Sequence, residues 1–412
     1  FYFFLLRIII LGRIFDTRSF GYIKYKNFSV GKHALAETRR FFVSYKNFMM
    51  FFLIRAKMLF SAARIVDTAL SIKDRSEGIF IDHIVYLNGL YFEVFYKNKK
   101  IIYANGFPKG FFVIDGKKNF RGVFKKTDSI FKIDVPKRLS KNQKKLAKSK
   151  ISETLKNPKK IPYLSNANFK KLDDKIDFSK VSHVVYAHSF TDAQLAYGYD
   201  GFSDTRDWLI YTIEKLSKLK SKIIIKGHPN FYNFKFGEAA MIDNSIFQKI
   251  IKRFSKNNNL IFLNRPIRNN DLLKKLSKKT ILITHHGTTI FDANLKKFKI
   301  ISSSETFYRK NVKISNTWNN ISAYSSLLEK NYHQLSKHYK KILNVSYGLY
   351  FNRYNLYGKK FFIKIIKKYI NINKKNFQTK HMKKNIDEIN FNKSSNYLCK
   401  ELSSEIENLK FF

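Results

Sequence analysis

The fold is decided by two stretches of the chain, Lys222-Ile-Ile-Ile-Lys-Gly-His228-Pro229-Asn230 and Thr280-Ile-Leu-Ile-Thr-His-His-Gly287-Thr288-Thr289-Ile-Phe-Asp292. Each stretch is a short apolar run that ends at a tight turn, which is typical of a buried strand. The carboxyl ends of neighbouring parallel strands form a crevice in which α/β proteins hold nucleotides. The two stretches therefore predict a nucleotide-binding crevice at one edge of a parallel sheet.

Strands and helices alternate along the middle of the chain. We expect strands at 183–187, 222–226, 260–263, 280–284 and 299–302, and helices at 205–218, 242–254, 270–276 and 288–296. Asp204 stands where it can cap the first of these helices. Alternation at this spacing predicts the α/β class, with a parallel sheet and right-handed crossovers.

The rest of the chain is less regular. We expect a helix at 39–70 and strands at 79–86 and 99–103, with turns at Asn88-Gly89 and Asn105-Gly106. Residues 121–162 carry 14 Lys and Arg against 3 acids and predict a solvated, partly helical connector. Helices are expected at 322–329, 332–343 and 359–370, before a loose tail. We divide the chain into domains 1–180 and 181–345 and a helical, partly disordered basic tail, 346–412.

Composition leaves the partner open. The 412 residues are 44% hydrophobic, enough for a core in each of two domains. The formal charge of +49 indicates either an anionic partner or the Lys- and Asn-rich bias of an AT-rich genome. The lysines are spread along the chain and no RNA-binding signature is present, so no specific nucleic acid partner is expected. The single cysteine, Cys399, excludes an intrachain disulfide and any Cys-rich metal site.

No segment of the sequence is long enough to span a bilayer, which takes ~20 apolar residues. The apolar runs at 1–11 and 41–54 are shorter, and the second is expected to form a buried helix. Because the chain begins with Phe1, the first run could be the remnant of a longer segment. We expect a cytoplasmic protein, with peripheral contact to the anionic inner face of the plasma membrane as an option.

His228 is the first candidate site residue. Pro229 keeps the residue before it extended, so the imidazole can face the crevice, with Asn230 beside it. The alternative is a loop histidine with a local hydrogen bond. Lys226 is expected to be an ordinary surface lysine.

The second turn predicts a phosphate site. Gly287 lets the backbone approach a ligand, and the hydroxyls of Thr288 and Thr289 are expected to cap the following helix. His286 is expected to face the site while His285 packs. No carboxylate cluster accompanies the histidines, so no metal and no cofactor are expected. Asp292 could bind a ribose or simply suit the helix dipole.

Further candidates come from loops. His188 and Asp192 lie in a long polar loop after the first strand of the sheet and could contribute to the crevice, although Asp192 could instead cap a turn. Asp82 and Glu93 are the acceptor-side candidates, since a transfer reaction needs a base for the acceptor hydroxyl. Each of these two carboxylates could equally be structural.

These motifs resemble a known group of enzymes. His188-Ser-Phe-Thr-Asp192, Lys226-Gly-His228-Pro229-Asn230 and His286-Gly-Thr-Thr-Ile-Phe-Asp292-Ala-Asn look like those of bacterial capsule and surface-polysaccharide biosynthesis proteins. A His-Pro motif followed by a Ser/Thr pair is shared by capsule Kdo transferases, bacterial sialyltransferases and CDP-glycerol glycerophosphotransferases. The resemblance covers roughly residues 181–305. The acidic pair ending in Gly that sialyltransferases use for base catalysis is not evident, so the base stays open.

The resemblance implies a GT-B fold, in which two Rossmann-type domains face a central cleft and C-terminal helices follow. It implies that domain 181–345 binds a nucleotide-activated sugar or polyol, CMP- or CDP-linked by preference. Domain 1–180, truncated if the chain is incomplete, would then bind a glycan or lipid-linked acceptor. His228 and Thr288/Thr289 would contact the donor phosphate without a metal. The expected protein is a surface-polysaccharide glycosyltransferase or glycerophosphotransferase. The alternatives are a nucleotide-sugar epimerase on the same scaffold and a non-enzymatic nucleic-acid or membrane binder.

Overall fold

The structure is a computed structural model that describes residues 8, 17–42, 48–76, 78–81, 86–95, 100–106, 109–115, 135–158, 167–192, 200–232, 238–306 and 313–350. The chain divides into two compact units, Phe1–Arg353 and Tyr354–Phe412. The second unit lies wholly outside the described residues, and with it most of the predicted tail and the helix expected at 359–370. Asp82 also lies outside them.

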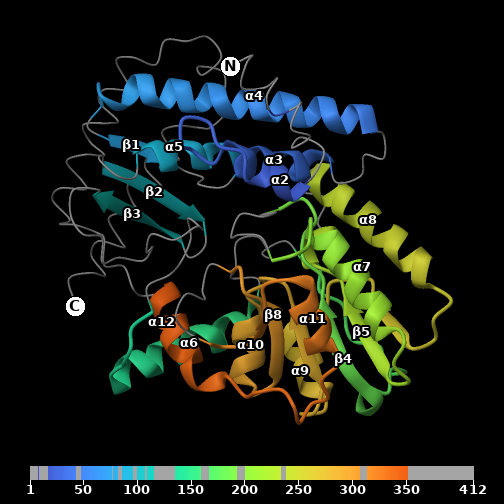
Figure 1. The fold of residues 1–412 in the computed structure, drawn as a ribbon. Coiled ribbons are helices and arrows are strands. Elements are labelled where there is room, and N and C mark those ends of the chain that lie inside the picture. The colour runs from blue at the N-terminus through green and yellow to red at the C-terminus, as the bar shows by residue number, and fades with distance from the viewer. Residues whose placement is uncertain are drawn as a thin grey trace. The chain divides into compact units, whose positions relative to one another are not determined.

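The larger unit contains a six-stranded parallel sheet (Figure 1). Its strands run in the order β6-β5-β4-β7-β8-β9. Their bounds are β4 (Val181–Tyr186), β5 (Lys222–Lys226), β6 (Leu260–Leu263), β7 (Ile281–Thr284), β8 (Lys299–Ser303) and β9 (Asn316–Trp318). In chain order this is the Rossmann pattern, whose direction of winding reverses between β4 and β7. The predicted α/β class with a parallel sheet is confirmed, while the short polar strand β9 was not expected.

Helices cover both faces of this sheet, which is why its strands are apolar without alternation. Val185, Ile225 and Ile283 pack on one face against α7 (Thr205–Leu216), α8 (Glu238–Phe254) and α11 (Ile321–Leu328). Ile224 and Leu282 pack on the other face against α9 (Asn269–Lys275) and α10 (Thr289–Leu295). The Asp204 carboxylate accepts from the amide of Asp207, so the predicted cap of α7 is confirmed.

The described residues before 116 form a smaller, mixed sheet with order β1-β2-β3, parallel between the first two strands and antiparallel between the last two. The elements here are α2 (Thr17–Gly21), α3 (Val30–Phe42), α4 (Phe48–Lys73), β1 (Gly78–Ile81), η1 (Tyr86–Asn88), α5 (Gly89–Phe95), β2 (Lys100–Gly106) and β3 (Lys109–Asp115). Two helices, α3 and α4, thus occupy the region around 39–70, where the sequence predicts a single helix. A second Rossmann-type sheet is not seen among these described residues.

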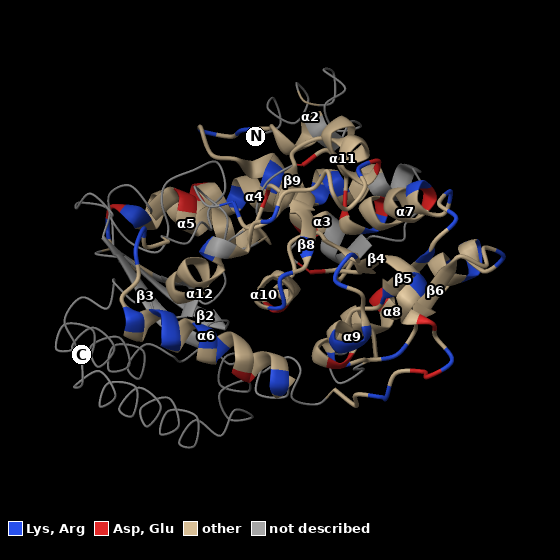
Figure 2. Ribbon diagram, turned by 90° about the horizontal axis from the view of Figure 1, so that it is seen from below, with Lys and Arg blue, Asp and Glu red and all other residues tan. Residues whose placement is uncertain are grey.

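The basic connector contains α6 (Lys141–Lys156). At its N-terminus the side chains of Ser140 and Gln143 each accept a hydrogen bond from the backbone amide of the other, which forms a capping box. Lys and Arg residues line this helix in Figure 2. Ala147, Ile151 and Leu155 are nevertheless buried, so α6 belongs to the core as well as to the solvated surface. Among the described residues, no helix is long and apolar enough to cross a membrane.

The helix expected at 332–343 is wrong in its first half. Regular structure begins only with η7 (Tyr339–Lys341) and α12 (Ile342–Tyr350). The Asn331 side chain accepts from the amides of His333 and Gln334, and Lys299 donates to the carbonyls of Tyr332 and Leu335. These bonds hold the segment in a turn and occupy carbonyls that a helix would need.

Candidate functional site

Three imidazoles meet where the winding of the sheet reverses. His188 follows β4, His228 follows β5 and His286 follows β7, and these three strands are neighbours. The ring centroid of His188 lies 3.8 Å from that of His286 and 5.7 Å from that of His228. We call these three residues the imidazole cluster. It stands at the carboxyl edge of the sheet, where Rossmann-type proteins bind ligands.

The cluster is held largely uncharged. Burial lowers the pKa of His188 to about 4, although the charge of Asp192 and the carbonyl of Ser189 oppose this shift. Burial, followed by the neighbouring His188 ring, also lowers the pKa values of His228 and His286 well below the usual value. At neutral pH the three rings are therefore uncharged and each carries one N–H, which His188 donates to the carbonyl of Ser189.

The tautomer of His228 follows from one contact. The amide of Asn230 donates to His228 Nδ1 at 3.3 Å, so the ring proton of the neutral imidazole is on Nε2. Pro229 starts a 3-10 turn, Pro229–Tyr232, that places this amide. An Nε2–H donor at the sheet edge is suited to an anionic oxygen.

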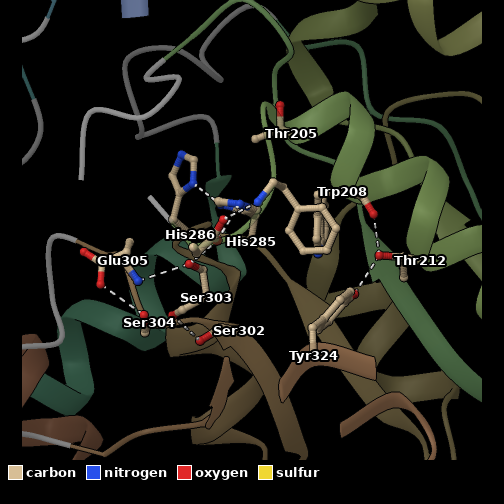
Figure 3. A network of polar contacts seen from close by, with 12 residues as sticks. Thr205, Trp208, Thr212, His285, His286, Ser302, Ser303, Ser304, Glu305 and Tyr324 are labelled. Atoms are coloured by element: carbon tan, nitrogen blue, oxygen red, sulfur yellow. Dashed lines mark hydrogen bonds and ion pairs between the residues drawn. The ribbon is translucent and has the colours of Figure 1, made fainter. Parts of the chain in front are cut away.

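A second chain of contacts, from Asp200 through His285, reaches His286. The buried carboxylate of Asp200 lies 3.0 Å from His285 Nε2 and also accepts from the hydroxyl of Ser303. His285 Nδ1 lies 2.7 Å from His286 Nδ1, so one of the two rings donates a hydrogen bond to the other (Figure 3). Burial alone would raise the pKa of Asp200, but His285 and the hydrogen bonds of Ser303 and Phe202 lower it. His285 thus orients His286 as well as packing, edge-on, against Trp208.

Sequence reasoning missed Asp200 and Ser303. The available signal was the pair Asp200-Gly201, in which Gly201 has a φ of +110° and comes so close to the start of α11 that a Cβ would lie 2.8 Å from the Ile321 nitrogen. Only glycine fits this position. It brings the end of the β4 loop against α11 and places the preceding carboxylate at His285.

The Gly287-Thr288-Thr289 turn differs from the prediction. Thr288 is the N-cap of α10, but it makes no side-chain capping bond because its backbone is already helical, with φ −64° and ψ −14°. The hydroxyl cap expected there is wrong. A Cβ on Gly287 would lie 2.8 Å from Thr284 Oγ1, so the turn needs glycine to pass this close to β7.

Lys226 is not a surface lysine, contrary to the prediction. It is only 5% exposed, because β5 lies inside the sheet with both faces covered, and its Nζ lies 5.8 Å from the centroid of the Tyr186 ring. Asn269 donates to Asp292 at 2.8 Å and accepts from the Tyr186 hydroxyl at 2.9 Å. Burial lowers the pKa of Lys226 to about 8 against the charge of Asp292. Burial raises the pKa of Asp292 to about 7 against the Asn269 bond and Lys226.

Replacing Asp292 by asparagine is expected to flatten the pH dependence of stability. The pKa of Asp292 is raised on folding, to about 7, so its contribution is full below the unfolded pKa and is lost as pH rises through 7. Between pH 5 and 8 the wild type should lose about 2 kcal/mol more unfolding free energy than Asp292→Asn, in denaturant titrations. The almost fully exposed Asp174 gives the control, Asp174→Asn, which should follow the wild type. Parallel profiles for Asp292→Asn and wild type would contradict the assignment.

The candidate carboxylates Asp192, from the crevice, and Glu93, from the acceptor side, have separate positions. Asp192 accepts from the hydroxyl of Tyr86 at 2.8 Å and acts electrostatically on His188. Glu93 instead lies 3.0 Å from His33 Nε2 and accepts from the Ser29 amide, within the N-terminal helices. Burial would raise the pKa of Glu93, but His33 and Ser29 lower it to about 2. Glu93 is thus an ionised structural partner of His33 in this structure.

Asp243, in α8, fixes the loop that carries His188. Sequence reasoning missed this residue as well. The Asp243 carboxylate accepts from the Ser189 hydroxyl and from the amides of Phe190 and Thr191. Burial raises the pKa of Asp243 to about 6, with these bonds opposing the shift. Among the described residues, no group of three or more His, Cys, Asp or Glu side chains could hold a metal ion.

The solved structures that are similar to this chain include a transferase and an epimerase. No protein-family model matches the chain, and no curated protein matches it significantly. The beta Kdo 2,4 transferase KpsC of Thermosulfurimonas dismutans is 11% identical, with a TM-score of 0.32, over 52% of this chain and 56% of that one. The UDP-GlcNAc 2-epimerase of Methanocaldococcus jannaschii, solved with UDP-GlcNAc and UDP, is 10% identical, with a TM-score of 0.30, over 70% of this chain and 79% of that one. The chain thus spans little more than half the length of the transferase. TM-scores this low carry no argument about activity, and the fold assignment rests on the strand order.

Proposed function

We propose that the protein is a GT-B-type transferase of surface-polysaccharide biosynthesis, which moves a sugar or a polyol phosphate from a nucleotide-activated donor to a glycan or lipid-linked acceptor. One observation carries this proposal: the neutral imidazoles of His188, His228 and His286 meet at the point where the winding of a Rossmann-order sheet reverses. That point is where such sheets bind nucleotides. The resemblance of the His-Pro motif to the enzymes named above favours CMP- or CDP-linked donors over UDP-linked ones.

The donor side of the proposed mechanism uses His228. Its Nε2–H donates to an oxygen of the donor phosphate, and charge that develops as the phosphate leaves strengthens that bond. His286 and the backbone around Gly287 would lie next to the same phosphate. Asp292, beside the buried Lys226, would accept a ribose hydroxyl. A fixed donor at the leaving oxygen contributes about 10²- to 10³-fold in other enzymes.

The acceptor side uses His188 and Asp192. The acceptor hydroxyl attacks the carbon or phosphorus atom that is transferred. The bond between that atom and the nucleotide phosphate breaks, and the nucleotide departs with the electron pair of that bond. The hydroxyl proton passes to His188, whose ring is neutral at pH 7 and stands beside the Asp192 carboxylate. We assign donor binding to residues 181–345 and acceptor binding to residues 1–180, on the cytoplasmic side of the membrane.

Two other functions fit part of the site. An epimerase would use the same phosphate contacts but no acceptor, so a labelled nucleotide-sugar incubated alone would return an isomer. A basic binding protein would depend on the +49 charge and on surfaces such as α6 rather than on the imidazole cluster. Its affinity for an anionic polymer or vesicle would fall steeply with salt and would not change on loss of His228.

A thermal-shift panel of CMP, CDP, UDP and GDP tests the proposal. At concentrations far above Kd, at least one cytidine nucleotide should raise the Tm by about 3 °C or more, at high as well as low salt. Inorganic phosphate at the same ionic strength serves as the control for charge alone. If no nucleotide raises the Tm and the protein binds heparin only at low salt, the transferase proposal is wrong and the basic binding protein is the better assignment.

A further inference from the structure

Tyr86 has an unusual backbone conformation. It begins η1, is buried, and has a φ of +58°. The left-handed region is uncommon and strained for a bulky side chain. Such a residue persists only where its surroundings determine it, and these positions cluster at functional sites. The contacts around Tyr86 therefore indicate what the strained backbone achieves.

Helices α3 and α5 hold this backbone in place. His33 Nδ1 lies 2.6 Å from the carbonyl oxygen of Tyr86, and the opposite ring nitrogen lies 3.0 Å from Glu93. The amide of Leu87, the next residue, donates to the Glu37 carboxylate. The side chains of Glu93, Glu37 and the buried His33 thus fix this single turn.

The result of this arrangement is a hydroxyl at the edge of the large sheet. The Tyr86 hydroxyl donates to Asp192 Oδ1 at 2.8 Å, across 106 residues of sequence. Asp192 acts electrostatically on His188, whose ring contacts both His286 and His228. A path of contacts therefore runs from Glu93 through His33 and Tyr86 to Asp192, and the charge of Asp192 acts on the imidazole cluster through His188.

We infer that Tyr86 is a positioning residue of the site, which fixes Asp192 against His188 and makes the acceptor side depend on the N-terminal helices. This inference rests on the proposed function for the role of His188, but the contact itself is independent of it. The aromatic ring is long enough to bring the Tyr86 hydroxyl to Asp192, and the left-handed backbone sets the direction of that ring.

The electrostatics give the direction of the expected change. The groups that face His188 are Asp192, His228, His285 and His286, and Asp192 alone among them is an acid. Without the Tyr86 hydroxyl, Asp192 loses one hydrogen bond and its position relative to His188 is less firmly fixed. The pKa of His188, about 4 in the intact site, should then fall, and the acid limb of the turnover profile should move to lower pH.

The test compares Tyr86→Phe with Tyr25→Phe. Each variant removes one hydrogen bond from a tyrosine of the N-terminal part to an aspartate, because the Tyr25 hydroxyl donates to Asp67 at 3.2 Å. We expect Tyr86→Phe to lower kcat about tenfold, with nucleotide affinity unchanged within twofold, while Tyr25→Phe matches the wild type. Asp192→Asn should reproduce the loss, and the double variant should be no worse than Asp192→Asn alone.

A spectroscopic measurement keeps the test independent of turnover. The ring signals of His188, assigned by comparison with His188→Gln, should shift in Tyr86→Phe and Asp192→Asn alike and stay in place in Tyr25→Phe. Unchanged His188 signals, or a Tyr86→Phe effect that persists in full when Asp192 is already asparagine, would overturn the inference. Absence of nucleotide binding by the wild type would instead count against the proposed function, and leaves the signal comparison to decide on Tyr86.

Discussion

The His228→Ala variant is expected to lose about 10²- to 10³-fold in turnover with the sheet intact. The amide of Asn230 fixes the His228 proton on Nε2, so alanine removes a donor that is oriented before the nucleotide arrives. Removal of one such fixed donor costs about 2.7–4 kcal/mol of transition-state stabilisation. The measurement is kcat with a labelled CMP- or CDP-linked donor, together with the Tm of the variant.

Two further variants make this result specific. His333 lies on the surface, so His333→Ala should retain the wild-type rate. His228→Gln keeps an N–H donor without a titrating ring and should recover part of the loss. Because burial keeps the pKa of His228 well below its usual value, the His228-dependent part of the rate should be flat between pH 6 and 8. Full activity in a folded His228→Ala variant would remove His228 from the mechanism.

The Asp200→Ala variant is expected to lose about 3 kcal/mol of unfolding free energy at pH 7. The Asp200 carboxylate is buried and accepts from both His285 and Ser303. Its removal leaves both donors without their acceptor, and breaking a buried pair by removing one partner costs about 3–5 kcal/mol. Denaturant unfolding gives the value, with the exposed Asp74→Ala variant as the control.

The pH dependence of that loss has a defined sign. The pKa of Asp200 is lower in the folded protein than in the unfolded chain, because His285 and Ser303 stabilise the ionised form. Its stabilisation is therefore present above the unfolded pKa of about 4 and disappears as pH falls through the folded pKa. The difference between wild type and Asp200→Ala should be full at pH 7 and shrink below about pH 4. A difference that does not change with pH would point to packing rather than to the ion pair.

The sequence predicted the regular part of the large sheet well. The strands β5 and β6 coincide with the expected ranges, since both are short apolar runs bounded by turns and polar residues. The N-cap at Asp204 was also predictable, because it depends on residues three apart. Local chemistry decides such features, and the sequence displays it directly.

Other features depend on distant parts of the chain. Lys226 is buried only because β4 and β6 flank its strand and helices cover both faces, which its neighbours in sequence do not reveal. Asp200 meets Ser303 across 103 residues, and Tyr86 meets Asp192 across 106. No periodicity encodes these pairs. The histidines could be proposed as a group because each follows a predicted strand, whereas their supporting partners lie in loops or beyond.

The order of the strands also bears on how the protein is made. β4 pairs with β5, which follows about 40 residues later, and with β7, which follows about 100 residues later. Closing the longer loop costs more entropy and is the slower step. A chain growing from the ribosome can therefore assemble its first two neighbours early, while His286 joins His188 only after most of the larger unit has been translated. The imidazole cluster is accordingly complete only late in the synthesis of the chain.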